Sequence, residues 1–191
     1  MGFSGGALAQ EGKIRIGNIS IISGLALQEE YDDNIYLGNG NDPTTPKVSD
    51  WITHLRPSLI AKYDMMERGS LSLGYTGDFA YYSSNTSNNW ASNGINFIGD
   101  YKAPVGLIVG ISNSYVNSND PYSSANQYRL GQTVQRWVDT LQTKVGYEFS
   151  DKYRILAFYN YSQVQYDQDI NSAQNYYSNE VGVGAEMRVM P

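Results

Sequence analysis

Cysteine is absent from the 191-residue sequence, and histidine occurs once, at His54. Without cysteine the chain has no disulfides, no thiolate metal ligands and no cysteine nucleophile. A zinc site and a Ser-His-Asp triad lack their parts as well, so we expect no catalytic residues, no metal and no cofactor. No motif places a nucleophile beside a base, and we therefore predict that the protein is not an enzyme.

Basic residues are also scarce, since 13 Lys and Arg stand against 19 Asp and Glu and the net charge is -6. A nucleic acid partner needs a basic surface, so we exclude one. No stretch approaches the roughly 18 consecutive apolar residues of a transmembrane helix. Tyrosine and glycine are abundant instead, with 17 and 19 copies. That composition favours strands and turns over helices.

Two successive segments, 51–65 and 70–81, alternate between apolar and polar residues with a period of two. Side chains of an extended chain point to opposite faces in turn, so each segment predicts a strand with one apolar and one polar face. In the first segment the apolar face carries Trp51, Thr53, Leu55, Pro57, Leu59, Ala61, Tyr63 and Met65. The short break at residues 67–69 joins the two segments into a predicted hairpin.

The same alternation recurs along the chain and predicts eight strands in all. Beyond the first hairpin, the segments lie near residues 20–36, 95–103, 105–115, 137–149, 153–162 and 180–189. The connections alternate between long and polar, at 38–50, 83–93, 117–135 and 168–176, and short, at 67–69, Pro104 and 150–152. We expect the short turns and both chain termini in the periplasm and the long loops outside the cell.

Alternation also fits a soluble up-and-down barrel or β-sandwich, which packs its apolar face inward. Two features favour a membrane: the strands exceed the usual five or six residues, and aromatic residues gather towards strand ends, as in interfacial girdles. We predict interface positions for Trp51, Tyr63, Tyr81, Tyr101, Trp137, Tyr147 and Phe149. The predicted fold is an all-β, antiparallel up-and-down transmembrane β-barrel in contact with outer-membrane lipid.

The first ten residues, "MGFSGGALAQ", end in small residues that resemble the cleavage site of a secretory signal peptide. The charged and long apolar parts of a signal are missing, so a clipped signal remnant and an ordinary flexible N-terminus both fit. We assign residues 1–17 to this segment and exclude them from the fold. Residues 18–191 form the predicted β-barrel domain.

The run "LALQEEYDDNIYL", followed by "SDWITHLRPSLIAKYD" and a Gly-rich alternating strand, resembles the start of the outer-membrane β-barrel porins of Gram-negative bacteria. The resemblance implies location in the cell outer membrane and a porin-like function. Such proteins are usually about twice as long, and the final residues "MRVMP" lack the terminal aromatic of a last outer-membrane strand. The chain therefore fits either an eight-stranded barrel or the N-terminal half of a larger one.

Charged residues of both signs lie on the predicted inner face of the barrel. We predict lumen-lining positions for His54, Arg56, Lys62, Asp64, Asp78, Asp100, Lys102, Lys144, Glu148, Glu186 and Arg188. In an eight-stranded barrel these side chains would fill the interior as a salt-bridge network, whereas in a wider barrel they would line a channel. We expect a porin-like or surface-anchoring role. The alternative is a structural subunit that self-assembles at the cell surface through barrel edges or loops, as a homo-oligomer or with an additional barrel segment.

Overall fold

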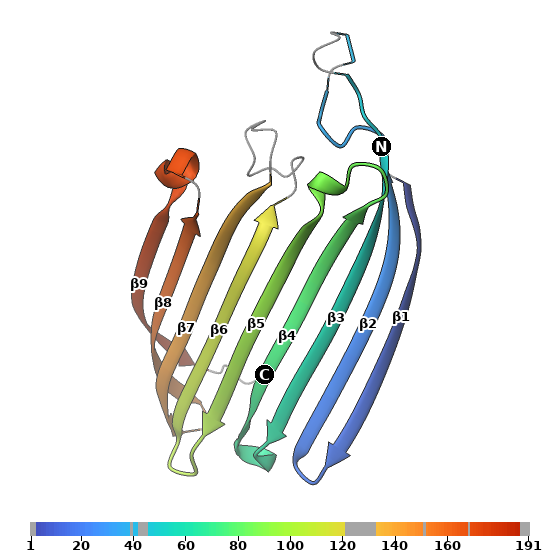
Figure 1. The fold of residues 1–191 in the computed structure, drawn as a ribbon. Helices are drawn as coiled ribbons and strands as arrows, with labels where there is room; N and C mark the ends of the chain where they lie inside the picture. The colour runs from blue at the N-terminus through green and yellow to red at the C-terminus, as the bar shows by residue number, and fades with distance from the viewer. Residues whose placement is uncertain are drawn as a thin grey trace.

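A computed structural model describes residues 3–38, 40–41, 46–120, 133–150, 152–167 and 169–187. These residues form one antiparallel sheet in which the strands follow one another in sequence order (Figure 1). The strands are β1 (Phe3–Ile16), β2 (Ile19–Asp32), β3 (Asp50–Asp64), β4 (Gly69–Tyr82), β5 (Trp90–Lys102), β6 (Leu107–Asp120), β7 (Val134–Ser150), β8 (Tyr153–Tyr166) and β9 (Tyr176–Met187). No helix within the described ranges is long and apolar enough to cross a membrane.

The predicted all-β, antiparallel up-and-down fold is confirmed, because every strand pairs with its neighbours in the chain and each of these pairs is antiparallel. Strand lengths range from 12 residues in β9 to 17 in β7. A tilted strand needs about 9 to 11 residues to cross a bilayer, so each strand is long enough to cross one.

The connections divide the sheet into two ends. At the turn end, short connections join β1 to β2, β3 to β4, β5 to β6 and β7 to β8. At the loop end, longer connections follow β2, β4, β6 and β8, and two of them contain the 3-10 helices Thr86–Asn88 and Asp169–Gln174. The alternation of long and short connections predicted from the sequence is therefore confirmed.

The structure corrects the predicted strand number, because the residues that it describes form nine strands and not eight. The additional strand is β1, which lies in the segment that we had excluded from the fold. It pairs with β2 through Lys13 and Ile22 and through Ile16 and Ile19. Gly17, at φ 58°, begins the two-residue turn between them, and such turns require this left-handed conformation.

The position of the N-terminus changes as a consequence. The first strand was predicted near residues 20–36, starting at the turn end, but this segment is β2 and ends at Asp32. Because β1 precedes it, the described chain begins at the loop end (Figure 1). The small residues of "MGFSGGALAQ" suggested a signal sequence, whereas the alternation of Lys13 and Arg15 with Ile14 and Ile16 is typical of a strand.

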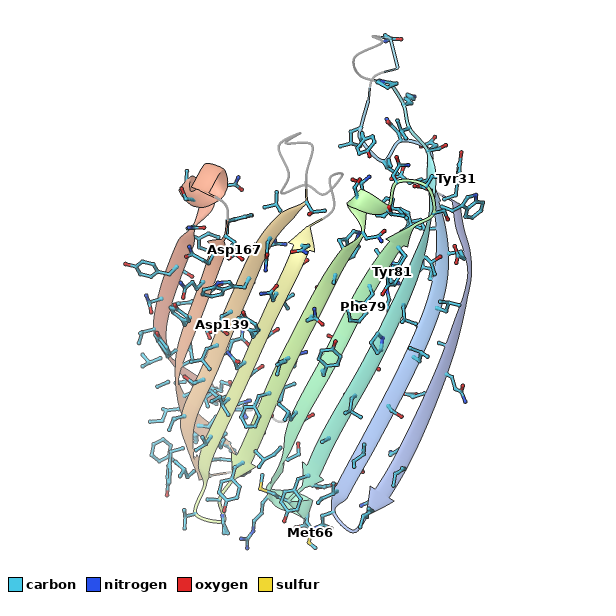
Figure 2. The ribbon with its side chains drawn as sticks, in the orientation of Figure 1. Tyr31, Met66, Phe79, Tyr81, Asp139 and Asp167 are labelled. Atoms are coloured by element: carbon cyan, nitrogen blue, oxygen red, sulfur yellow. The ribbon has the colours of Figure 1, made fainter. Side chains whose placement is uncertain are left out.

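The two faces of the sheet differ in chemistry as the alternation predicted. We call the face that carries Leu59, Leu73 and Ile95 the apolar face, and the opposite one the polar face. Figure 2 shows Phe79 and Tyr81 among the side chains of the apolar face. Leu59, Leu73 and Ile95 are exposed by 50%, 54% and 51%. A soluble sheet protein would bury such a face against a second layer.

Burial is concentrated on the polar face, close to the loop end. One cluster contains Ile35, Ile52, Ala80 and Tyr82, with Trp90 packed against it. A second contains Val134, Val164 and Tyr166. The polar face is therefore not uniformly polar: near the long loops it supports two small apolar cores, and polar and charged side chains occupy the rest of it.

Candidate functional site

Aromatic residues near the turn end form a diagonal line across the apolar face. The residues that pair in register with Tyr63 of β3 form a row across the sheet. This row passes through one residue on each intervening strand and reaches Tyr159 of β8. Measured from this row towards the turn end, Tyr101 lies two residues lower on β5. Tyr147 lies four residues lower on β7, and Tyr153 lies six residues lower on β8. The line therefore descends by about one residue per strand.

The slope of the aromatic line gives the tilt of the strands away from an axis perpendicular to that line. A step of ~3.3 Å along the strand for each ~4.8 Å across the sheet corresponds to a tilt of ~35°. Strands of outer-membrane barrels are tilted by about 35–45°. An aromatic girdle that lies parallel to the membrane would therefore follow such a diagonal line across the paired residues. Along β3, the 12 residue-to-residue steps from Trp51 to Tyr63 then cover a height of ~32 Å. The hydrocarbon core of a bilayer is about 30 Å thick.

The register places six of the seven predicted interface aromatics on the apolar face, and the seventh, Phe149, lies at the register shift between Glu148 and Ser150, where its ring meets Tyr147. Trp51, Tyr81 and Trp137 lie towards the loop end, and Tyr63, Tyr101, Tyr147 and Phe149 lie towards the turn end. Some of their rings meet in pairs, such as Tyr147 with Phe149 at a centroid distance of 5.1 Å. Contact with lipid stays a prediction for each of them.

Two acidic residues depart from the apolar pattern of this face. Glu29 of β2 pairs in register with Thr53 of β3 and accepts a hydrogen bond of 2.7 Å from its hydroxyl group. Asp139 of β7 lies two residues from Trp137, and its Oδ1 accepts a hydrogen bond of 2.7 Å from Asn113 Nδ2 on the neighbouring strand (Figure 2). The amide also donates to the carbonyl oxygen of Thr140 at 3.3 Å. The carboxylate is thus paired, and it lies close to the loop-end limit of the apolar band.

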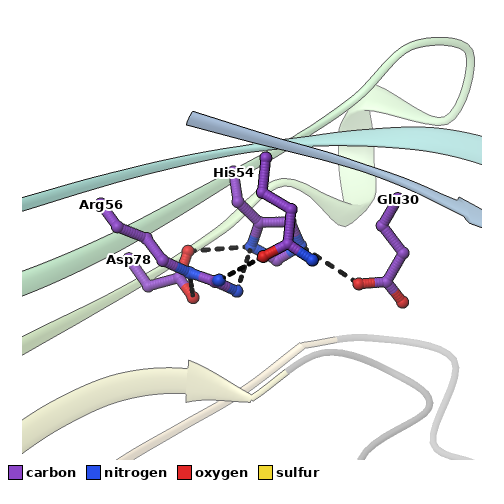
Figure 3. A network of polar contacts seen from close by, with 5 residues as sticks. Glu30, His54, Arg56 and Asp78 are labelled. Carbon is purple, nitrogen blue, oxygen red and sulfur yellow. Dashed lines mark hydrogen bonds and ion pairs between the residues drawn. The ribbon is translucent and has the colours of Figure 1, made fainter. Parts of the chain in front are cut away.

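The polar face carries a charged network near the loop end, built from three adjacent strands (Figure 3). Asp78 of β4 is its centre, because its two carboxylate oxygens contact different partners on β3. Oδ1 lies 2.9 Å from His54 Nδ1, and Oδ2 accepts a hydrogen bond of 2.8 Å from Arg56 Nε. On the other side, β2 contributes Gln28, which accepts from Arg56 Nη1, and Glu30, whose Oε2 lies 3.7 Å from His54 Nε2.

His54 is the most enclosed member of this network, which we call the loop-end network. It is only 5% exposed, and its ring meets the edge of Trp90 at a centroid distance of 5.7 Å. The apolar cluster around Ile52 and Ala80 therefore limits its access to water from the loop side. The contacts with Asp78 and Glu30 hold the imidazole in one orientation, and no hydroxyl nucleophile is among the partners described for it.

A second polar arrangement fastens the start of β3 to the connection that follows β4. Asp50 precedes Trp51, beyond the apolar band, and accepts hydrogen bonds from the backbone N–H groups of Trp51, Ser84 and Asn85 and from the Asn85 side chain. Burial opposes ionisation of this carboxyl, but these hydrogen bonds outweigh it and hold the pKa of Asp50 below its ordinary value.

Ion pairs cross the polar face nearer the turn end. Asp100 of β5 lies 3.0 Å from Lys144 of β7, although β6 runs between these strands. There is room for the contact because Gly110 of β6 has no side chain, and a Cβ there would approach Lys144 Cε to 2.3 Å. Lys102 and Glu148 span the same two strands at 2.8 Å.

The predicted lumen-lining residues thus fall into two groups and do not form one network. His54, Arg56 and Asp78 meet at the loop end, and Asp100, Lys102, Lys144 and Glu148 pair towards the turn end. Lys62 and Asp64 lie on the polar face, and Asp64 accepts a hydrogen bond from the backbone N–H of Met66 in the adjoining turn. Arg188 lies outside the described residues. The lining role of the set stays a prediction.

Sequence reasoning overlooked several partners of these residues. Glu30 and Gln28 belong to the loop-end network, and Arg154 of β8 pairs with Glu186 of β9. Their alternation within strands was a usable signal, since Gln28 and Glu30 continue the polar positions of β2. The pairings themselves depend on register. Among the described residues, no group of three or more acidic or histidine side chains is arranged to hold a metal ion.

Comparisons with known proteins support the fold and leave the activity open. No family model and no curated protein matches the sequence. Among solved structures, the chain is similar to OmpT (in-vitro folded), an outer membrane protein of Vibrio cholerae, with a TM-score of 0.52 and 15% sequence identity. The match covers 93% of this chain and 53% of that protein. The chain therefore spans about half the length of the structure that it matches, and its fold resembles that of an outer-membrane β-barrel protein.

Proposed function

We propose that the chain forms part of a β-barrel in the outer membrane of a Gram-negative bacterium and that the polar face lines a water-filled, porin-like interior. The observation that carries the proposal is the aromatic diagonal on an exposed apolar face. Its slope corresponds to the ~35° tilt of a membrane barrel, and the apolar band that it limits has the height of a bilayer core. A soluble sandwich has no reason to place aromatic residues along such a line.

The charges of the polar face favour a channel over a filled interior. The side chains of Asp100 and Lys144 pair at 3.0 Å, yet each is 51% exposed. In a narrow barrel such residues would have to be enclosed and fully paired. Exposed charges of both signs on the wall of a wider barrel would instead act on passing ions.

Two measurements test the proposal. Membrane insertion is tested first, by partition into detergent and by a shift in gel migration on heating, and a chain that stays soluble without detergent would overturn both the location and the channel. Ion conduction is then measured across planar bilayers with the full-length polypeptide that carries this sequence. Discrete conductance steps are expected, and their absence from an inserted, heat-modifiable protein would support surface anchoring instead.

A charge variant tests the role of the polar face. Asp100→Asn removes a wall carboxylate and leaves Lys144 unopposed, so the ratio of anion to cation permeability should rise. Glu67→Gln is the matched control, because Glu67 lies in the short turn after β3, away from the wall. Equal reversal potentials for the two variants would contradict a lining role for Asp100.

A further inference from the structure

The polar face is hollowed across strands β5 to β9 (Figure 1). The hollow has a volume of about 460 Å³, which lies within the range of about 300–1,000 Å³ for small-molecule sites. The register explains its floor, because Gly110 of β6 pairs with Asp100 and Lys144 on the neighbouring strands. Two positions further along β6, Ser112 pairs with Gln142 of β7. Since Gly110 has no side chain and Ser112 has a small one, β6 forms a low floor between β5 and β7.

The charged side chains of this hollow, which we call the wall hollow, are paired within the protein. Asp100 lies 3.0 Å from Lys144, and Glu180 of β9 accepts a hydrogen bond of 2.9 Å from Asn160 Nδ2 of β8. Two carboxylates and one ammonium group belong to the lining, so an anion is repelled. A cation would have to displace partners that the chain itself supplies. The wall hollow therefore favours an uncharged solute.

The other polar groups of the lining are neutral. Gln142 is exposed, and its amide offers two donor hydrogens and an acceptor oxygen. The hydroxyl of Ser112 both donates and accepts. The Asn160 amide nitrogen is engaged by Glu180, which leaves its carbonyl oxygen as an acceptor. This mixture of donors and acceptors matches a solute with several hydroxyl groups, because each hydroxyl also donates and accepts.

Two apolar side chains complete the lining. Ile98 of β5 is 46% exposed, and Phe158 of β8 lies on the other side of the floor. Gly182 of β9 makes room for the aromatic ring, because a Cβ there would overlap the end of the ring. Three sheet spacings, ~14 Å in all, separate β5 from β8. Apolar surfaces on both sides of neutral hydrogen-bonding groups suit a sugar ring, whose C–H faces are apolar and whose hydroxyls lie around its edge.

We propose that the wall hollow is a binding site for a neutral carbohydrate in the interior of the barrel. Phe158 packs against the apolar face of a sugar ring, and Ser112 and Gln142 exchange hydrogen bonds with its hydroxyls. The ion pair over Gly110 limits the hollow on the side of the turn end. This inference rests on the proposed function, because the site must be reached through a water-filled interior.

Maltose binding tests the site. The full-length polypeptide that carries this sequence is purified in detergent, and saturation-transfer NMR follows the sugar protons. We expect saturable binding with a dissociation constant on the order of 1 mM. Phe158→Ala should raise this constant about 10-fold, because the sugar loses its apolar partner, whereas Phe158→Tyr keeps the ring and should raise it less than about 3-fold. Ser112→Leu fills the floor and should abolish binding.

Phe97→Ala is the matched control. Phe97 also lies within a strand, but it pairs with Leu73 on the apolar face, so its loss should leave the dissociation constant of maltose unchanged. A shift in gel migration on heating shows that each variant is folded before binding is measured. Equal dissociation constants for the natural chain, Phe158→Ala and Ser112→Leu, or no binding of maltose to the folded natural chain, would overturn the proposal.

Two charged probes test the preference for a neutral solute. Triglycine is a zwitterion and gluconate is an anion that resembles a sugar in its hydroxyl groups. Maltose should bind more tightly than either, and tighter binding of triglycine or gluconate would overturn the assignment to neutral carbohydrate.

Failure of the site and failure of the channel give different results, because binding in detergent does not require conduction. A protein that gives conductance steps in bilayers but does not bind maltose would contradict the site alone. A protein that binds maltose with the expected dependence on Phe158, yet gives no conductance steps, would contradict the channel and support the site.

Discussion

Replacement of Asp50 by alanine tests the attachment between β3 and the connection after β4. The carboxylate accepts hydrogen bonds of 2.9, 3.1 and 2.8 Å from the backbone N–H groups of Trp51, Ser84 and Asn85, and one of 2.8 Å from the Asn85 side chain. A hydrogen bond to a charged group contributes about 1.5–3 kcal/mol. Because freed donors at the loop end can turn partly to water, we expect Asp50→Ala to lower the free energy of unfolding by about 2 kcal/mol in total.

Asp50→Asn is the matched control, because it keeps the volume and one acceptor oxygen but loses the charge. We expect about half the loss of the alanine variant, since hydrogen bonds to neutral acceptors contribute about 1 kcal/mol each. The measurement is urea unfolding in detergent micelles, followed by tryptophan fluorescence, for the natural chain and both variants at pH 7.

The pH dependence gives an independent check of the same contacts. The pKa of Asp50 lies below its usual value of 3.8 in the folded protein, so folding favours the ionised form. The stabilisation is therefore complete above the unfolded pKa and is lost as the pH falls through the lower folded pKa. The difference in the free energy of unfolding between the natural chain and Asp50→Asn should be constant from about pH 5 to 7 and should become smaller below about pH 3.8. A difference in the free energy of unfolding under about 0.5 kcal/mol at pH 7, or a difference that does not change in acid, would refute this reasoning.

Two further substitutions test the faces and the close approach of strands. Leu73→Lys places a charge in the middle of the apolar face and should lower the free energy of unfolding by about 2–4 kcal/mol in lipid. Ser72→Lys, on the polar face, should lower it far less. Equal losses for the two variants in unfolding experiments in vesicles would argue against lipid on the apolar face. Gly69→Ala should prevent normal folding, because its Cβ would lie 1.9 Å from the carbonyl oxygen of Asp100. Gly184→Ala is the control, because its Cβ would meet no atom within 4 Å. The heat-modifiable fraction on gels is compared for the two variants, and an unaffected Gly69→Ala chain would contradict the described backbone.

The alternation of apolar and polar residues could be recognised from the sequence alone, because it is a local property of an extended chain. Leu71, Leu73 and Tyr75 could therefore be assigned to one face and Ser70 and Ser72 to the other, and the faces agree with the register. The aromatic residues predicted for the interfaces were assigned to their face in the same way, and their contact with lipid stays a prediction. The strand β1 was missed because the small residues in its first half are also typical of a signal cleavage site. We gave this composition more weight than the alternation at Lys13 to Ile16.

The sequence by itself thus determined the strand type, the two faces and the order of long and short connections. Only the tertiary structure decided which residues meet, because register depends on hydrogen bonds between segments that are distant in the chain. Asp78 reaches His54 and Arg56 since β4 lies beside β3 in one particular register, and Asp100 reaches Lys144 across a glycine. The tilt of the aromatic line likewise arises from pairing, which no single segment encodes.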